Sequence, residues 1–257
     1  MNKILTIKCP YGFANQLRLL LGANFLVKEK IFDIAFQDWI INNHNIVNFN
    51  DFFEPLPNVF IKKIQDKHVI VSNSSYTLLV KKLCLKKNYS IGQSLQASFL
   101  DLHLKNIYSN IINDYIDKFN IKNTIGIHVR TGCKTALLSI SPQRDKPISQ
   151  DLLINILKNT DDFIYLATDN AETQDKFLNI FKDRILFFEK LIDGNEKFEG
   201  KYTEEKVKRF TSDLSVIADF YILQKCKVFL GSNESTFSLI IKYLRDNPYD
   251  YKIIGKL

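Results

Sequence analysis

The sequence predicts an α/β protein whose second half is a doubly wound, Rossmann-like domain. Three observations support this fold class. From residue 124 onward, short apolar runs alternate with longer amphipathic segments, the pattern of strands and helices in a parallel sheet. Residues 3–36 have the pattern of a strand, a helix and a strand, which also builds a parallel sheet. Polar residues follow several of the strands, where open α/β sheets bind their ligands.

The first half of the chain is the less regular one. Pro10 and Gly12 mark a turn after the first strand, and Asn15 is predicted to cap the helix that follows. Residues 120–123 are the predicted linker between an N-terminal domain, 1–120, and a C-terminal domain, 121–257. The expected elements before the linker are strands at 3–8, 31–36 and 69–72, an irregular loop over 40–60 and one helix over 94–119.

The second half repeats strand and helix more cleanly. A lysine- and glutamate-rich loop is expected over 189–210. The expected strands cover 124–129, 163–167, 184–188, 227–230 and 252–254. The expected helices cover 149–159, the residues after Asn170 to about 181, 212–224 and the residues after Ser235 to about 245.

Composition excludes several classes of protein. The 257 residues are 46% hydrophobic and 25% charged, which is ordinary for a globular protein. A net charge of +7 without an arginine-rich run gives no indication of nucleic-acid binding. The four cysteines are far apart, which argues against a zinc site or disulfides and favours a reducing compartment, so a cytoplasmic protein is expected. No signal peptide is expected, because the N-terminus leads straight into a short strand. No transmembrane segment is expected, because no apolar run approaches about 18 residues.

The first chemical motif follows the apolar strand at 124–129. His128 and Arg130 alternate with Val129, so both are expected on one face, where an imidazole and a guanidinium suit an anion such as a phosphate. Lys134 adds a third basic group. The structural alternative is a salt-bridged arginine beside a core histidine. A P-loop is rejected, because Cys133 separates the Gly-Lys pair, the spacing is one residue too long and Gly126 falls inside the strand.

The other two motifs also follow, or lie close to, strands. Asp169 and Asn170 end the strand at 163–167; a helix cap is favoured for Asn170, whereas Asp169 could both cap and function. Asp219 lies in an apolar helical run and needs a partner if buried. It could accept two hydrogen bonds from a guanine edge. The alternative is a solvent-facing residue, because Ser212, Ser215 and Asp219 share one helical face.

Small hydroxyl residues mark the last turn before a helix. Gly231, Ser232, Ser235 and Thr236 place hydroxyls and free backbone N–H groups at that helix N-terminus, which is an anion site by dipole and geometry. The alternative is a plain helix cap.

Four motifs in order resemble the GDP-fucose-dependent fucosyltransferases. They read PYGFANQLRLLLGA, IGIHVRTGCK, YLATDN and ADFYILQKCKVFLGSNESTFSLI. The nearest pattern is that of the α1,6-fucosyltransferases and protein O-fucosyltransferases, and the first motif is also similar to the GLGNQL turn of α1,2-fucosyltransferases. The resemblance covers the N-terminal motif and most of 124–241, whereas 40–120 matches no pattern.

The resemblance implies a GT-B-like fold of two Rossmann-like domains. The C-terminal one would bind GDP-fucose without a metal or cofactor, and the N-terminal one would face a glycan or glycoconjugate acceptor. By position, His128 and Asp219 would contact guanine, Arg130 would hold the diphosphate and act in catalysis, and Ser235 and Thr236 would bind the diphosphate. The other donor-binding residues would be Asn15, Lys134, Asp169, which would help shape the site, Ser232 and Phe237.

The chemistry of fucosyl transfer fits these residues. The GDP leaving group gains negative charge as the anomeric carbon becomes oxocarbenium-like. Without a metal, Arg130, Lys134 and the helix N-terminus would stabilise that charge. Direct attack by the acceptor hydroxyl would invert the anomeric centre.

Some positions depart from the α1,6-fucosyltransferase pattern. Thr131 and Cys133 stand where it has an Arg and an Asp, and Leu138 stands where it has a Glu. The general base, the acceptor and the linkage are therefore not identified. Two alternatives stay open: a transferase of the same fold that uses another GDP-sugar or acceptor, and a non-catalytic nucleotide- or carbohydrate-binding protein.

Overall fold

The chain forms two compact units, Met1–Asn110 and Ile111–Leu257. The computed structural model describes all residues except 1–3, 10–12, 40–48, 62–69, 72–79, 85, 87–89, 131–149, 189–196, 199–206, 209–211, 233–234, 246–250 and 255–257. The units divide within helix α5 (Asn106–Lys118), and the predicted boundary between residues 120 and 121 follows that helix. The roles assigned to the two domains stay predictions.

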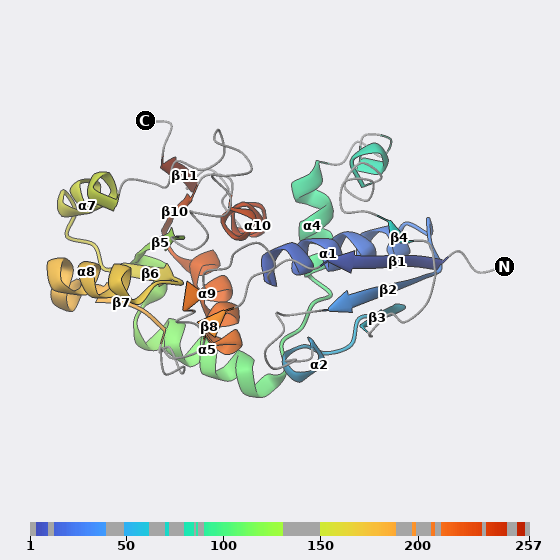
Figure 1. The fold of residues 1–257 in the computed structure, drawn as a ribbon, viewed down its shortest axis with the longest axis horizontal. Coiled ribbons are helices and arrows are strands. Elements are labelled where there is room, and N and C mark those ends of the chain that lie inside the picture. The colour runs from blue at the N-terminus through green and yellow to red at the C-terminus, as the bar shows by residue number, and fades with distance from the viewer. Residues whose placement is uncertain are drawn as a thin grey trace. The chain divides into compact units, whose positions relative to one another are not determined.

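The N-terminal unit is built on a parallel sheet in the order β3-β2-β1-β4 (Figure 1). Helix α1 (Phe13–Lys28) joins the first two strands and forms the βαβ opening that the sequence predicts. The strands are β1 (Ile4–Cys9), β2 (Ile34–Trp39), β3 (Val59–Ile61) and β4 (Ile70–Val71).

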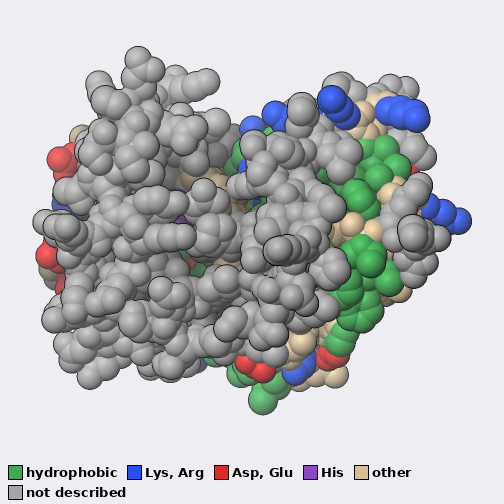
Figure 2. Space-filling view, turned by 45° about the vertical axis from the view of Figure 1, so that its right-hand side comes forward, with side chains coloured by type: hydrophobic (Ala, Val, Ile, Leu, Met, Phe, Trp, Pro, Cys, Tyr) green, Lys and Arg blue, Asp and Glu red, His purple; other side chains and the backbone are tan. Residues whose placement is uncertain are grey.

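Helix α1 covers one face of this sheet. The side-chain amide of Gln37 on β2 donates to the carbonyl of Gln16 on α1 over 2.9 Å, and both residues are fully buried. The opposite face carries Ile4 and Phe60, which are 42% and 48% exposed, and Phe60 packs on Phe36 with 5.6 Å between ring centroids. Figure 2 shows hydrophobic side chains at the surface of this unit, in the right-hand part of the view.

The predicted single helix over 94–119 is wrong. Two helices form, α4 (Ile91–Phe99) and α5, because the chain between them pairs with residues next to α2 (Phe49–Phe52). The backbone N–H of Glu54 donates to His103 O, and that of Lys105 donates to Phe52 O, each over 2.9 Å. These tertiary hydrogen bonds override the helical pattern of the intervening residues.

Two smaller predictions in this unit also fail. Residues 40–60 are not wholly irregular, because α2 lies within them and β3 begins at Val59. Asn15 is not the cap of α1, because the helix already begins at Phe13 and Asn15 lies in its first turn.

The C-terminal unit contains a five-stranded parallel sheet in the order β11-β10-β5-β6-β7. The predicted strands and helices of this half are found within a few residues of their expected positions, so the doubly wound fold is confirmed. An antiparallel pair, β8 (Lys197–Phe198) and β9 (Val207–Lys208), lies in the segment expected to be a loop. The sheet strands are β5 (Ile125–Val129), β6 (Ile164–Thr168), β7 (Ile185–Leu186), β10 (Val228–Ser232) and β11 (Tyr251–Ile254).

Helices cover both faces of this sheet (Figure 1). On one face, Ile125, Ile127 and Val129 form a buried cluster with side chains of α7 (Gln150–Lys158) and α8 (Ala171–Phe181). The alternate residues of β5 face α9 (Asp213–Lys225) and α10 (Thr236–Leu244). A parallel sheet covered on both faces explains why its strands are nearly continuous apolar runs.

Gly126 allows α9 to approach β5 closely. A Cβ atom at this position would lie 2.7 Å from Cys226 Sγ and 2.9 Å from Leu223 Cδ2. Any side chain would therefore push the end of α9 away from the sheet. The glycine of the rejected P-loop pattern thus has a packing role inside the strand.

A buried arginine closes the C-terminal end of α9. Arg245 is 3% exposed, and its guanidinium donates to the carbonyls of Leu223, Cys226 and Lys227 over 2.9, 2.7 and 3.1 Å. A cation is favourable at a helix C-terminus, where the carbonyl groups lack helical partners. This contact anchors the start of the segment after α10 to the end of α9.

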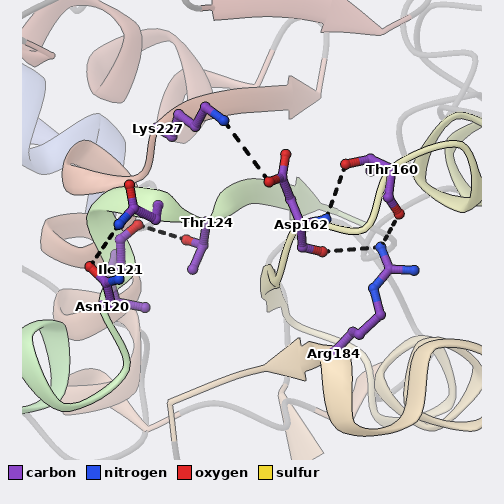
Figure 3. Close-up of polar contacts among 8 residues, drawn as sticks. Asn120, Ile121, Thr124, Thr160, Asp162, Arg184 and Lys227 are labelled. Carbon is purple, nitrogen blue, oxygen red and sulfur yellow. Dashed lines mark hydrogen bonds and ion pairs between the residues drawn. The ribbon is translucent and has the colours of Figure 1, made fainter.

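The amino edge of the sheet is held by polar contacts between loops (Figure 3). Arg184, directly before β7, donates to the backbone carbonyls of Thr160 and Asp162. Lys227, directly before β10, lies 3.9 Å from the Asp162 carboxylate. These groups bind one another and the loop backbone, which is a structural role.

The carboxyl edge contains the topological switch point of the sheet. After β5 the chain crosses through α7 to β6 on one side, and after β10 it crosses through α10 on the other face to β11 on the opposite side. The switch point therefore lies between the carboxyl ends of β5 and β10. Ligands of open α/β sheets bind at this point.

Candidate functional site

The carboxyl end of β5 places two of the predicted basic residues at the switch point. His128 is the fourth residue of β5 and half-buried, and Arg130 follows the strand and is exposed. The register pairs Val129 with Thr168 of β6, so the next residues, Arg130 and Asp169, leave neighbouring strands at the same edge. The edge therefore carries an exposed guanidinium, as expected for an anion site.

His128 is fixed by α10. Its Nδ1 lies 2.8 Å from Oγ of Ser238, which is fully buried, and its ring lies 4.7 Å from the ring of Phe237. A hydrogen bond at one ring nitrogen sets the orientation of the other nitrogen. The first turns of α10 thus hold the imidazole at the end of β5.

The N-terminus of α10 carries a buried hydroxyl. Ser235 is the N-cap residue and is 4% exposed, yet its Oγ has no hydrogen-bond partner among the residues that the structure describes. Ser235 thus occupies the cap position without a side-chain capping hydrogen bond, and the anion site there stays a prediction. A buried hydroxyl without a partner among the described residues, at the positive end of a helix dipole, favours an anionic ligand there.

Asp219 lies on the face of α9 that packs against the sheet. It is 4% exposed, so the solvent-facing alternative is wrong. The hydroxyl of Tyr165 on β6 donates to its Oδ1 over 2.6 Å. Burial, reinforced by the nearby Asp219 charge, raises the pKa of Tyr165 well above its ordinary value, so the phenol stays protonated and acts as the donor.

Phe237 connects the two predicted base-binding elements. Its ring lies 4.7 Å from that of His128 and 5.8 Å from that of Phe220, the buried residue next to Asp219. β5, α9 and α10 therefore meet around one aromatic side chain.

The carboxyl end of β6 leads into the N-terminal cap of α8. Asn170 caps α8, because its side chain accepts a hydrogen bond from the backbone N–H of Thr173 over 2.8 Å, as predicted. Asp169 is half-buried directly before this cap. Its part in shaping the site stays a prediction.

Several predicted residues are only partly placed. Thr236 is the first residue of α10, and the backbone of Ser232 ends β10, although its side chain is outside the described part. Lys134 lies outside the described residues, as do Thr131, Cys133 and Leu138. Asn15 belongs to the other unit, and its role stays a prediction.

Comparison with known proteins yields structural neighbours. No protein-family model and no curated protein matches the sequence. The NodZ α-1,6-fucosyltransferase co-crystallised with GDP matches with a TM-score of 0.60 and 16% identity over 95% of this chain and 92% of that one; a NodZ structure from Bradyrhizobium gives 0.59 and 15% over 94% and 92%. POFUT1 in complex with GDP matches with 0.59 and 13% over 99% of both chains.

The chain has the GT-B fold of these fucosyltransferases. The predicted fold class is thereby confirmed, and the order of the sequence motifs agrees with it.

Two polar residues of this GT-B site were not singled out from the sequence. Ser238 supports His128, and Tyr165 supports Asp219. Ser238 is a hydroxyl residue within an otherwise apolar helical face, and Tyr165 is the polar-tipped residue of an apolar strand. Both patterns are weak signals, because each partner lies far away in sequence.

The residues that the structure describes include neither a cluster of metal ligands nor a membrane-spanning helix. Among them, no group of three or more His, Cys, Asp or Glu side chains could hold a metal ion. Within the same residues, no helix has the length and apolar character needed to cross a membrane.

Proposed function

We propose that the protein transfers fucose from GDP-fucose to a hydroxyl group of a glycan or glycoconjugate acceptor. The observation that carries the proposal is the buried hydroxyl of Ser235 at the N-terminus of α10. It lies one helical turn before Ser238, which contacts His128 at the end of β5. The neighbours of the same fold include NodZ co-crystallised with GDP and POFUT1 in complex with GDP-fucose, which supports GDP-fucose as the donor.

The diphosphate would bind at the switch point. Arg130, exposed at the end of β5, would form bidentate hydrogen bonds with it, and Lys134 would add charge. Ser235 and Thr236 would donate hydroxyl hydrogens, together with backbone N–H groups of the first turn of α10. Ser232, at the end of β10, would complete this side of the site.

The guanine would bind at the carboxyl end of β5, on the side of the sheet that α9 and α10 cover. Asp219 would accept hydrogen bonds from N1–H and the 2-amino group, which adenine and uracil do not present together. His128 would contact the base, and Phe237, packed against His128, would support it. Asp169 would shape the edge of the site.

The proposed reaction needs positive charge where GDP departs. Arg130, Lys134 and the α10 N-terminus would stabilise the growing charge on the β-phosphate, so the proposal includes no metal ion or cofactor. Direct attack by the acceptor hydroxyl would invert the anomeric centre. The cysteine spacing favours a reducing compartment, and we place the reaction in the cytoplasm.

A glycan-array transfer assay tests the proposal. The protein is incubated with GDP-fucose in EDTA, and both fucosylated products and released GDP are measured. Fucose transfer that continues in EDTA and stops in the Arg130→Ala variant is the expected result. Transfer only from another GDP-sugar would favour the first alternative, and donor binding without turnover on any acceptor would favour a binding protein. Activity that EDTA abolishes would contradict the metal-free part.

A further inference from the structure

We infer that Tyr165 is a positioning residue which sets the preference of the site for guanine by holding the carboxylate of Asp219. The inference rests on the proposed function, in which Asp219 accepts hydrogen bonds from the base. It concerns a residue that would not itself touch the ligand.

The geometry gives Tyr165 a fixed position. It is fully buried on β6, and its ring packs edge-on against Tyr115 of α5, with 6.1 Å between centroids and an angle of 77°. Tyr115 is itself held, because its hydroxyl donates to the backbone carbonyl of Phe187 over 2.9 Å. The Tyr165 hydroxyl therefore reaches Asp219 Oδ1 from a rigid support.

The contact acts on the orientation of the Asp219 carboxylate. A buried carboxylate is costly unless it is hydrogen-bonded, so the 2.6 Å bond stabilises Asp219 in one side-chain orientation. The two oxygens of an ionised carboxylate accept about four hydrogen bonds in total, so binding Tyr165 is compatible with binding a base. Guanine offers two donors side by side, and pairing with both demands a defined carboxylate plane.

Inosine diphosphate is a suitable probe of that plane. Its base keeps N1–H but lacks the 2-amino group, so the ratio of its dissociation constant to that of GDP measures how well Asp219 is aligned. A purely structural Tyr165–Asp219 pair would only attach β6 to α9. Its loss would lower thermal stability and leave the ratio unchanged.

The experiment is calorimetric titration of GDP and inosine diphosphate into wild type, Tyr165→Phe and Tyr115→Phe. Wild type should prefer GDP by about 10-fold or more. Tyr165→Phe keeps the ring and should reduce this ratio by about threefold or more. Tyr115→Phe is the matched control: it keeps the ring that packs on Tyr165 and loses a half-buried hydroxyl that binds the Phe187 carbonyl and not Asp219. Because the ring contact with Tyr165 remains, this variant should keep the ratio.

The outcomes separate this inference from the proposed function. A folded Tyr165→Phe protein with the wild-type ratio overturns the inference. If Asp219→Asn binds GDP as tightly as wild type, the base assignment in the proposed function fails instead. Should Tyr165→Phe not fold, 4-fluorophenylalanine at position 165 keeps the ring and replaces the hydroxyl by a fluorine that cannot donate; an unchanged ratio there also overturns the inference.

Discussion

Replacing Ser235 by alanine should stabilise the ligand-free protein while weakening its binding of GDP. The hydroxyl is buried, and no partner for it exists among the described residues. Leaving a buried hydroxyl unsatisfied costs about 1–3 kcal/mol. Because its side chain makes no cap hydrogen bond, alanine loses no capping energy. We expect a gain of about 1 kcal/mol, which raises Tm by about 2–4 °C in a protein of this size.

The same substitution should reduce GDP affinity. A hydrogen bond from a hydroxyl to a charged phosphate contributes about 1.5–3 kcal/mol, which corresponds to a loss of about 10- to 100-fold. Thermal unfolding without ligand and titration with GDP measure the two effects separately. Opposite signs of the two effects indicate a residue that is kept for binding at the expense of stability.

Ser212→Ala is the matched control. Ser212 is the N-cap residue of α9, and its Oγ accepts from the backbone N–H of Ser215 over 3.0 Å. Its loss should destabilise the protein by about 1 kcal/mol. A Ser235→Ala protein that melts below wild type, as Ser212→Ala should, would refute the reasoning, because the hydroxyl would then have a structural partner.

Three further predictions follow from other residues. Arg130→Ala should lower kcat by about 10²–10³ and leave Tm unchanged. Arg130→Lys should restore little of this activity, because an ammonium group cannot form the two parallel hydrogen bonds of a guanidinium. A folded Arg130→Ala enzyme with normal kcat would remove this residue from the mechanism. Arg245→Met should lower the free energy of unfolding by about 3 kcal/mol in urea, because it leaves buried carbonyls at the end of α9 without donors, and an unchanged midpoint would contradict this role. Burial raises the pKa of Cys226 from 9.0 to about 12, so above pH 9 the folded protein keeps a proton that the unfolded chain releases. The contribution of this thiol to stability should therefore be full below pH 9 and fall above it, by at most about 1.4 kcal/mol per pH unit. Urea unfolding of wild type and Cys226→Ala from pH 7 to about 10.5 should show a shallower fall of the free energy of unfolding in the variant.

The second half of the fold could be predicted because its local signals agree. The strands that carry His128 and Tyr165 are short apolar runs, and amphipathic segments of helical length separate them in the sequence. The order of these elements and the helix-capping residues between them both agree with a parallel sheet. The helix over 94–119 could not be predicted correctly, because its break depends on hydrogen bonds to residues next to α2. Such contacts between distant segments leave no periodic pattern in a single sequence.

The sequence predicted which residues the candidate site contains, but not the burial or the hydrogen-bond partners of their side chains. The face of α9 that carries Ser215 and Asp219 is polar in sequence, and this pattern also fits a surface helix. The structure buries both residues, because the face packs on β6 and Tyr165 satisfies the carboxylate. The sequence likewise shows hydroxyls before α10 but cannot show which of them has a partner.

Titration of GDP in the presence of EDTA tests the central claim most directly, namely that the switch point of the C-terminal unit binds GDP. We expect saturable binding of GDP at one site, retained in EDTA, with ADP and UDP binding far more weakly because they lack the paired guanine donors. Absence of GDP binding, or equal binding of the three nucleotides, would contradict it.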